Sequence, residues 1–426
     1  MANKSRPKKT RGQLYKKYVY GVKETVEEEN LEAEEYSEPQ VAVKDSYNYI
    51  WPLSQFQKID VLKMSIALQR GTMFYGQDQM KLPFELILLI LEHSQTPYCL
   101  SHLLLSRAFY ITLLPKLYRY PKLKSSNFSL FVDTVSQYQT KKRFNGFVKI
   151  LDLSQITQSG KNSYVSKLLR RFSNSLEIFI SSQSSFGLSP LISLRLCHNL
   201  KILDLRLVSE TVNLKELFNS IKSTPLLEQL SFPRSSISCE DYDMEWPANL
   251  WYLRLQGGIS PKFLTESRFP CSITCLEFSH CPFITGESLD DMLVRIGYNL
   301  RRLAIYYPMP KLKPNSLDTV FLDCPNLVYL YINIEYFSKE LFQDDLLPPL
   351  KEYPRPLRTL CIDSSGLLGQ GSKIHPDDLT IALWEERLPC LTSLKISMML
   401  GWNSQSDSVQ DLVNELEDRG GSLYKM

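Results

Sequence analysis

The stretch ITCLEF at residues 273–278 has apolar side chains at its first, fourth and sixth positions. This apolar-x-x-apolar-x-apolar pattern occurs ten times along the chain, and successive copies begin 23 to 34 residues apart. The ten copies begin at Val148, Leu176, Leu200, Leu227, Leu250, Ile273, Leu300, Leu327, Leu357 and Leu391. A pattern that recurs at such a period predicts a repeat architecture, with one structural unit for each copy.

Each copy has the pattern of a short strand that is buried on one face. Its fourth and sixth residues point to the same side of a strand, and its first residue enters the same core from the preceding corner. Between the strands the chain turns helical, as at residues 214–221, where apolar residues fall at i, i+3, i+4 and i+7. One unit cannot cover its own apolar face, but stacked units bury it. The sequence therefore predicts an α/β solenoid of about ten repeats, with a curved parallel sheet and outer helices.

Residues 273–285, with the sequence ITCLEFSHCPFIT, resemble the cysteine-containing leucine-rich repeat, in which Cys closes the strand and Ile-Thr opens the helix. Cys197 and Cys324 stand where that family has the Cys that ends such a helix. The resemblance implies a leucine-rich-repeat domain over residues 127–426. Ser181 interrupts the second copy, and residues 191–196 fit the pattern in another frame. The sequence therefore leaves the register between residues 176 and 199 open.

A compact helical segment precedes the repeats. Residues 82–91 read LPFELILLIL, with Pro83 in the first turn of the expected helix, where no backbone donor is lost. Apolar positions cover almost the whole circumference of that helix. Thr96 and Pro97 predict the start of a second helix, and a third follows from Phe109 to Leu117. Together the helices carry more apolar surface than the segment can bury, which predicts a partner that covers the rest.

Three parts of this segment resemble the F-box: LPFEL at 82–86, IL at 90–91 and LSRAF at 105–109. Ser106 and Phe109 stand where that family usually has Cys and Trp. The whole chain resembles the fungal (yeast-type) F-box/leucine-rich-repeat proteins, which implies a small all-α F-box at residues 80–121 before the repeats. It also implies docking on a Skp-type adaptor and, through it, on a cullin. The adaptor-binding residues that follow from the resemblance are Leu82, Pro83, Leu86, Ile90, Leu91, Leu100, Leu104, Leu105 and Phe109.

The concave side of the expected sheet is the predicted surface for a target protein. In each strand the residues that flank the sixth position of the pattern point to this side, which is the usual ligand surface of a solenoid. The middle repeats carry Arg and Tyr, residue types that dominate binding energy at interfaces. The predicted target-binding residues are Arg254, Glu277, Tyr306, Tyr331 and Asn333. An ordinary solvated strand surface would contain similar residues, so the prediction concerns the patch and not each member.

These features favour a substrate receptor of a Skp/cullin/F-box ubiquitin ligase, in which the F-box holds the adaptor and the repeats hold an unidentified target protein. Such a subunit is not an enzyme. Two other hypotheses stay open: a scaffold of F-box and adaptor that recruits no cullin, and a plain repeat protein whose helical cap only seals its first repeat.

The N-terminal region differs in composition from the rest of the chain. Residues 1–23 contain eight Lys or Arg and no acid, and residues 24–38 contain eight Glu and no base. Such charge blocks repel themselves, so we expect residues 1–45 to form a disordered charged arm. The basic block has the composition of a nuclear import signal or of a solvated tail, and we expect a cytoplasmic and/or nuclear protein. Residues 46–79 carry apolar side chains without a period and stay unassigned.

Composition excludes several classes of function. Lys and Arg total 49 against 46 acids, which argues against nucleic acid as the main partner. The longest apolar run is far shorter than a membrane helix, and no apolar segment at the N-terminus indicates secretion, so the nine cysteines are expected as free thiols. Cys271, Cys275, His280 and Cys281 lack the spacing of a zinc site. We expect no metal, no cofactor and no membrane partner.

Overall fold

The computed structural model describes residues 82–94, 98–136, 146–156, 162–183, 186–237, 242, 244–350, 353–367 and 373–426. The chain divides into two compact units, Met1–Ile90 and Leu91–Met426. Of the first unit the structure describes residues 82–90, which include most of helix α3 (Phe84–Glu92). The predictions for residues 1–45 and 46–79 lie outside the described residues. The predicted boundaries at residues 80, 121 and 127 stay predictions.

The second unit begins with short helices and continues into a large sheet. The helices before the sheet are η2 (Leu100–Leu104), α4 (Arg107–Arg119) and α5 (Phe128–Ser136). Helix α4 begins after Ser106, whose hydroxyl accepts a hydrogen bond from the Phe109 amide at 3.3 Å, as expected of an N-cap. Helix α5 buries Phe128, Val132 and Val135 on one face, because these residues recur at helical spacing.

The sheet is parallel and has eleven strands in the order β1-β2-β3-β5-β7-β8-β9-β10-β11-β12-β13. Its strands are β1 (Ile150–Asp152), β2 (Ile178–Ile180), β3 (Ile202–Asp204), β5 (Gln229–Ser231), β7 (Tyr252–Gln256), β8 (Cys275–Ser279), β9 (Arg302–Tyr306), β10 (Tyr329–Asn333), β11 (Thr359–Asp363), β12 (Ser393–Ile396) and β13 (Ser422–Lys425). A second, two-stranded sheet pairs β4 (Val212–Asn213) with β6 (Ser236–Ile237). The α/β fold with a long parallel sheet agrees with the sequence prediction.

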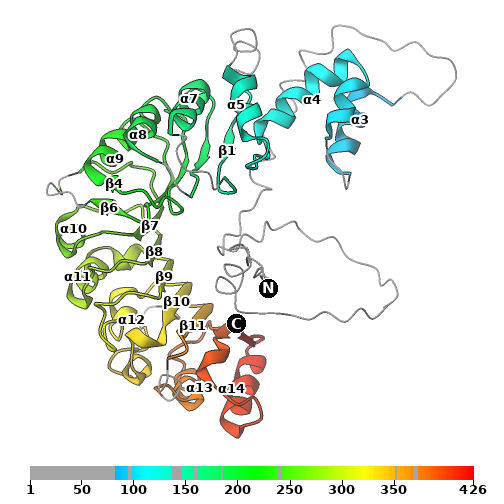
Figure 1. Cartoon of the computed structure of the whole chain (residues 1–426). Helices are drawn as coiled ribbons and strands as arrows, with labels where there is room; N and C mark the ends of the chain where they lie inside the picture. Colours follow the sequence, from blue (N-terminus) through cyan, green and yellow to red (C-terminus); the bar gives the residue numbers. More distant parts are fainter. Residues whose placement is uncertain are drawn as a thin grey trace, which may run out of the picture. The chain divides into compact units, whose positions relative to one another are not determined.

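Helices connect the strands of the large sheet and lie along one side of it (Figure 1). The α-helices are α7 (Asn162–Phe172), α8 (Leu188–Leu194), α9 (Leu214–Ile221), α10 (Pro261–Glu266), α11 (Gly286–Ile296), α12 (Val320–Asp323), α13 (Pro376–Trp384) and α14 (Asp407–Asp418). The 3-10 helices are η3 (Gly297–Asn299), η4 (Ile334–Tyr336), η5 (Lys339–Phe342) and η6 (Met398–Leu400). The core lies between the sheet and this layer of helices, where the apolar residues of the repeated pattern are buried.

The repeated pattern fixes the register of the sheet. Each of its ten copies contains one strand, and the fourth positions pair with one another across the sheet. The row formed in this way contains Leu151, Phe179, Leu203, Leu230, Leu253, Leu276, Leu303, Leu330, Leu360, Leu394 and Leu423. Its last member, Leu423 on β13, adds an eleventh strand that the pattern did not predict.

The register that the sequence left open is settled by strand β2. Phe179 pairs with Leu151 on one side and Leu203 on the other, so the copy that begins at Leu176 is the strand. Residues 191–196, which fit the pattern in another frame, lie in helix α8 and the turn after it. Their apolar spacing suits a helix because Leu191 and Leu194 stand three residues apart and are both buried.

Side chains at the corners of the repeats join neighbouring units. The amide groups of Asn199, Asn249 and Asn326 donate to backbone carbonyls of the preceding unit at 2.7, 3.1 and 2.9 Å. The thiol of Cys281 donates to the Leu255 carbonyl at 3.4 Å, and burial raises the pKa of this thiol to about 12. The eight described cysteines form no disulfide. Cys281 is thus an uncharged core residue that donates a weak hydrogen bond.

One turn of the sheet depends on a glycine. Gly257 has a φ of +81°, and a Cβ at this position would lie 2.6 Å from the carbonyl oxygen of Arg234. We expect Gly257→Ala to lower the free energy of unfolding by about 3 kcal/mol, from backbone strain and a backbone clash together. Gly401 is the matched control, because its φ is +69° and its Cβ would meet open space. Gly401→Ala should cost only about 1 kcal/mol in the same urea titration; equal losses would contradict the clash.

Candidate functional site

Helix α3 leaves its apolar side chains exposed. None of its residues is buried, although its sequence FELILLILE is almost entirely apolar. Leu86 is 44% and Ile90 is 56% exposed, and one helical turn separates them, so they share a face. The predicted residues Leu82 and Pro83, just before the helix, are exposed as well, and Leu91 is half-buried. Leu89 is also exposed, and it was not predicted because it lies outside the positions that resemble the F-box motif.

A second set of exposed apolar residues lies in the second unit. Leu104 at the end of η2 is 87% exposed and Leu105 in the following turn is 63% exposed. Ile111 on α4 is exposed too, and Phe109 is half-buried. Leu100 begins η2, but its side chain lies outside the described part of the chain. Adjacent leucines this exposed, with Ile111 nearby in the sequence, form a candidate contact surface, because grouped apolar side chains mark interaction sites.

A polar contact holds η2 close to α4. The Lys116 ammonium group lies 3.1 Å from the Glu92 carboxylate and donates to the Tyr98 hydroxyl at 2.7 Å. The same ammonium lies 4.8 Å from the centre of the Tyr98 ring. Burial, with the neighbouring Glu92 charge, raises the pKa of Tyr98 above its ordinary value. This contact fixes the segment that precedes η2, and with it the start of the turn that presents Leu104 and Leu105.

On the sheet, four of the five predicted target-binding residues lie in one cluster. The buried carboxylate of Glu277 on β8 receives the guanidinium group of Arg254 on β7 at 3.1 Å. Arg302 on β9 approaches the same carboxylate at 3.7 Å. Tyr306 on β9 lies under Arg254, with 5.3 Å between the guanidinium carbon and the ring centre, and Tyr331 on β10 lies 4.6 Å from Tyr306. One buried acid therefore holds two cations beside a row of aromatic rings.

The cluster contains two residues that the sequence analysis missed. Arg302 stacks over the Tyr329 ring at 4.1 Å, and both occupy the third position of their copies of the pattern. The third, fifth and seventh positions of a strand point to the same side, but only the fifth and seventh were considered. The alternation of side chains along a strand was therefore sufficient to predict that Arg302 and Tyr329 lie on this surface. Tyr331 donates its hydroxyl to the Asp363 carboxylate at 2.6 Å, which extends the cluster to β11.

Asn333 does not belong to this surface. Its side chain is fully buried, and its Oδ1 accepts a hydrogen bond from the Glu335 amide at 3.2 Å. The chain turns into η4 directly after Asn333, so the side chain caps that helix. It offers no exposed area to a partner. Glu277 is only 3% exposed, so its effect on any partner passes through the two arginines that it holds.

The ion cluster makes a prediction about stability. We expect Glu277→Gln to lower the free energy of unfolding by about 2 kcal/mol, because it removes the charge that compensates two half-desolvated guanidinium groups. Glu287→Gln on the exposed surface of α11 is the matched control and should change stability by less than about 0.5 kcal/mol. Urea titrations measure both. A Glu277→Gln protein as stable as the control would show that Arg254 and Arg302 do not need this carboxylate.

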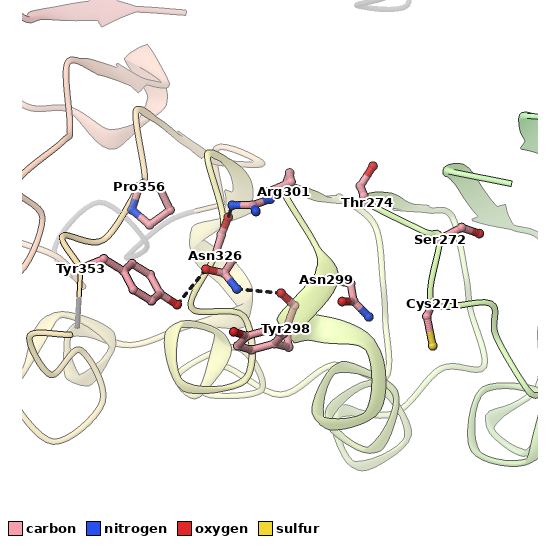
Figure 2. A pocket seen from close by; sticks show the side chains of 9 residues that line it. All are labelled: Cys271, Ser272, Thr274, Tyr298, Asn299, Arg301, Asn326, Tyr353 and Pro356. Carbon is pink, nitrogen blue, oxygen red and sulfur yellow. Dashed lines mark hydrogen bonds between the residues drawn. The ribbon is translucent and has the colours of Figure 1, made fainter. Parts of the chain in front are cut away.

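A separate hollow of about 550 Å³ lies at the corners of the middle repeats, and Figure 2 shows the side chains that line it. Asn326 donates to the Tyr298 carbonyl at 2.9 Å and accepts from the Tyr353 hydroxyl at 2.9 Å. These bonds satisfy the Asn326 amide within the chain and join neighbouring units, so this side chain has a structural role.

Sites of two other kinds are absent from the residues that the structure describes. None of their His, Cys, Asp and Glu side chains form a group of three or more that could hold a metal ion. None of their helices is long and apolar enough to cross a membrane.

Comparison with known proteins finds two curated fungal relatives. The F-box protein YDR306C of Saccharomyces cerevisiae is 54% identical over 326 residues, which cover 76% of this chain and 68% of that protein. The protein pof5 of Schizosaccharomyces pombe is 35% identical over 319 residues, which cover 75% of this chain and 89% of that protein. No model of a protein family matches the sequence. The likeness to both relatives extends over most of the chain.

Proposed function

Because this chain belongs to the family of fungal F-box proteins, we propose that it is the substrate-recognition subunit of a Skp/cullin/F-box ubiquitin ligase. In this proposal the F-box at residues 80–121 binds a Skp-type adaptor, and the adaptor binds a cullin. The repeats hold the target protein. The chain itself contributes no catalytic group, and the transfer of ubiquitin takes place on other subunits. We propose a cytoplasmic and/or nuclear location for this assembly.

The exposed aliphatic side chains carry the adaptor part of the proposal. Leu86 and Ile90 on α3, Leu104 at the end of η2 and Leu105 directly after it are each more than two-fifths exposed. Burying one such side chain against a partner contributes on the order of 1.5 to 3 kcal/mol. Four of them together contribute at most on the order of 6 to 12 kcal/mol, which offsets much of the cost of association. A bound adaptor gives a reason for apolar residues that the chain leaves uncovered.

The repeats carry the target part of the proposal. We propose that residues 127–426 form a leucine-rich-repeat domain, which is supported by the single row of Leu and Phe side chains along eleven strands. Arg254, Arg302, Tyr306 and Tyr331 would then form the centre of the target surface. The aromatic rings and the guanidinium groups are preorganised by Glu277 and by one another, so little side-chain entropy is lost when a target binds.

Co-purification from the native fungus followed by mass spectrometry tests the proposal. We expect the tagged full-length chain to retain both a Skp-type adaptor and a cullin. Recovery of the adaptor without a cullin would instead support a scaffold that acts outside the ligase. Recovery of neither would support a plain repeat protein whose helical segment only caps its first repeat, and it would overturn the proposal.

A further inference from the structure

A second hollow, of about 600 Å³, lies between α5 and α7 and has an unusual lining. It is formed by Val135, Ser136, Lys167, Arg170, Arg171, Ser173 and Asn174. Three of these seven residues are cations and none is an acid. The other polar members carry hydroxyl or amide groups, which can donate hydrogen bonds. Nearly every polar group around the hollow is therefore suited to an anion.

The fold places these cations together for a local reason. Helix α7 buries Val165, Leu168, Leu169 and Phe172 in the core, so Lys167 and Arg170 come to lie on its exposed face. Helix α5 packs against α7, with its Phe131 ring 6.2 Å from that of Phe172. The end of α5 thereby forms one wall of the hollow and the end of α7 forms the other.

Two of the three guanidinium nitrogens of Arg171 lack an acceptor among the described residues. Its Nε and Nη2 atoms are buried and have no hydrogen-bond partner among the residues that the structure describes. Partial burial also lowers the pKa of this group below its ordinary value. Buried donors without acceptors are costly, and a bound anion would remove that cost.

The neighbouring residue Arg170 is held in place by a hydrogen bond to helix α8. Arg170 donates from its Nε to the Ser193 hydroxyl at 3.1 Å, and Ser193 donates in turn to the Ser189 carbonyl at 2.9 Å. This chain of bonds uses one donor of the guanidinium group and leaves its two terminal nitrogens for another acceptor. Arg170 is thus a preorganised side chain at the edge of the hollow.

We propose that this hollow binds a phosphate group. The planar guanidinium groups of Arg170 and Arg171 can each donate paired hydrogen bonds to phosphate oxygens, and the Lys167 ammonium group adds a positive charge. Three cations without an acid match a dianion better than a single carboxylate. The phosphate belongs either to a free oligophosphate or to a phosphorylated side chain of a protein. The inference does not depend on adaptor or target binding, because none of the residues that line the hollow belongs to the proposed adaptor or target surface.

Calorimetric titration of the full-length chain in 0.15 M salt, on the order of physiological strength, tests this site. The probes are tripolyphosphate and a Gly-Ser peptide with one phosphoserine. We expect one saturable site. The double variant Lys167→Gln with Arg171→Gln should weaken binding at least about tenfold, because it removes two charge-assisted contacts. Lys215→Gln with Lys262→Gln is the matched control, since it removes the same charge from exposed positions on α9 and α10.

The outcomes separate the two sources of phosphate. Binding of the peptide, with displacement by tripolyphosphate, would assign the site to a phosphorylated protein, and binding of tripolyphosphate alone would assign it to a free oligophosphate. Absence of saturable binding by both probes would overturn the proposal, as would an equal loss in the control variant. Lys167→Glu is a second variant that should fold normally, because Lys167 is exposed and the substitution does not alter the core. This variant should also weaken phosphate binding by about tenfold or more.

Discussion

The double substitution Leu86→Asp with Ile90→Asp is expected to abolish binding of the Skp-type adaptor while the chain stays folded. Both side chains are exposed on one face of α3, so aspartate meets water in the free protein and costs little stability. In the complex each aspartate would be buried without a partner, which costs about 2 kcal/mol or more per site. The affinity should fall by about three orders of magnitude. Surface plasmon resonance with purified adaptor measures the change.

A matched control separates the role of α3 from a general effect of surface charge. Ile192→Asp with Leu196→Asp changes two exposed aliphatic residues, Ile192 on α8 and Leu196 in the turn after it, which are 44% and 46% exposed. This variant should bind the adaptor like the unchanged protein. Leu104→Asp with Leu105→Asp should weaken binding independently of α3. If the α3 variant retained full affinity, α3 would not be part of the adaptor surface.

The positions of the strands could be predicted from the sequence because the repeat leaves little freedom. Three of the six residues in each copy enter the core, and a shift of one residue would turn Leu276 or Leu303 toward solvent. Even the imperfect second copy follows the rule, because Phe179 keeps its place in the row although Ser181 replaces the sixth apolar residue. The neighbouring units therefore impose the register there.

The composition of the candidate surface was harder to predict, because side chains on the open face are not constrained by a shared core. Their arrangement depends on pairs across strands, such as Arg302 with Tyr329 or Tyr331 with Asp363, which come from different repeats. Asn333 shows the limit of strand reasoning: the strand pattern assigns it to the surface, but the chain leaves the strand there and uses it as a helix cap. The hollow beside Arg171 has no repeat signal, since it involves the ends of two particular helices.

The other large expected effect concerns the core of the repeats. We expect Leu276→Asp to unfold the middle of the solenoid. Leu276 is fully buried and pairs with Leu253 on β7 and Leu303 on β9. Removing a buried leucine side chain alone costs about 2 to 5 kcal/mol, and burying a carboxylate among these residues adds several more. The sum is comparable with the whole stability of an ordinary domain.

The loss should be local at first, because each repeat contacts only its neighbours. Hydrogen exchange followed by mass spectrometry should show lost protection on β7, β8 and β9, while β1 to β3 at one end and β11 to β13 at the other keep part of theirs. Leu276→Ala should give a graded loss, and Leu196→Asp at an exposed position should leave the exchange pattern unchanged. Uniform loss of protection along all eleven strands would mean that the sheet unfolds as one cooperative unit and not repeat by repeat.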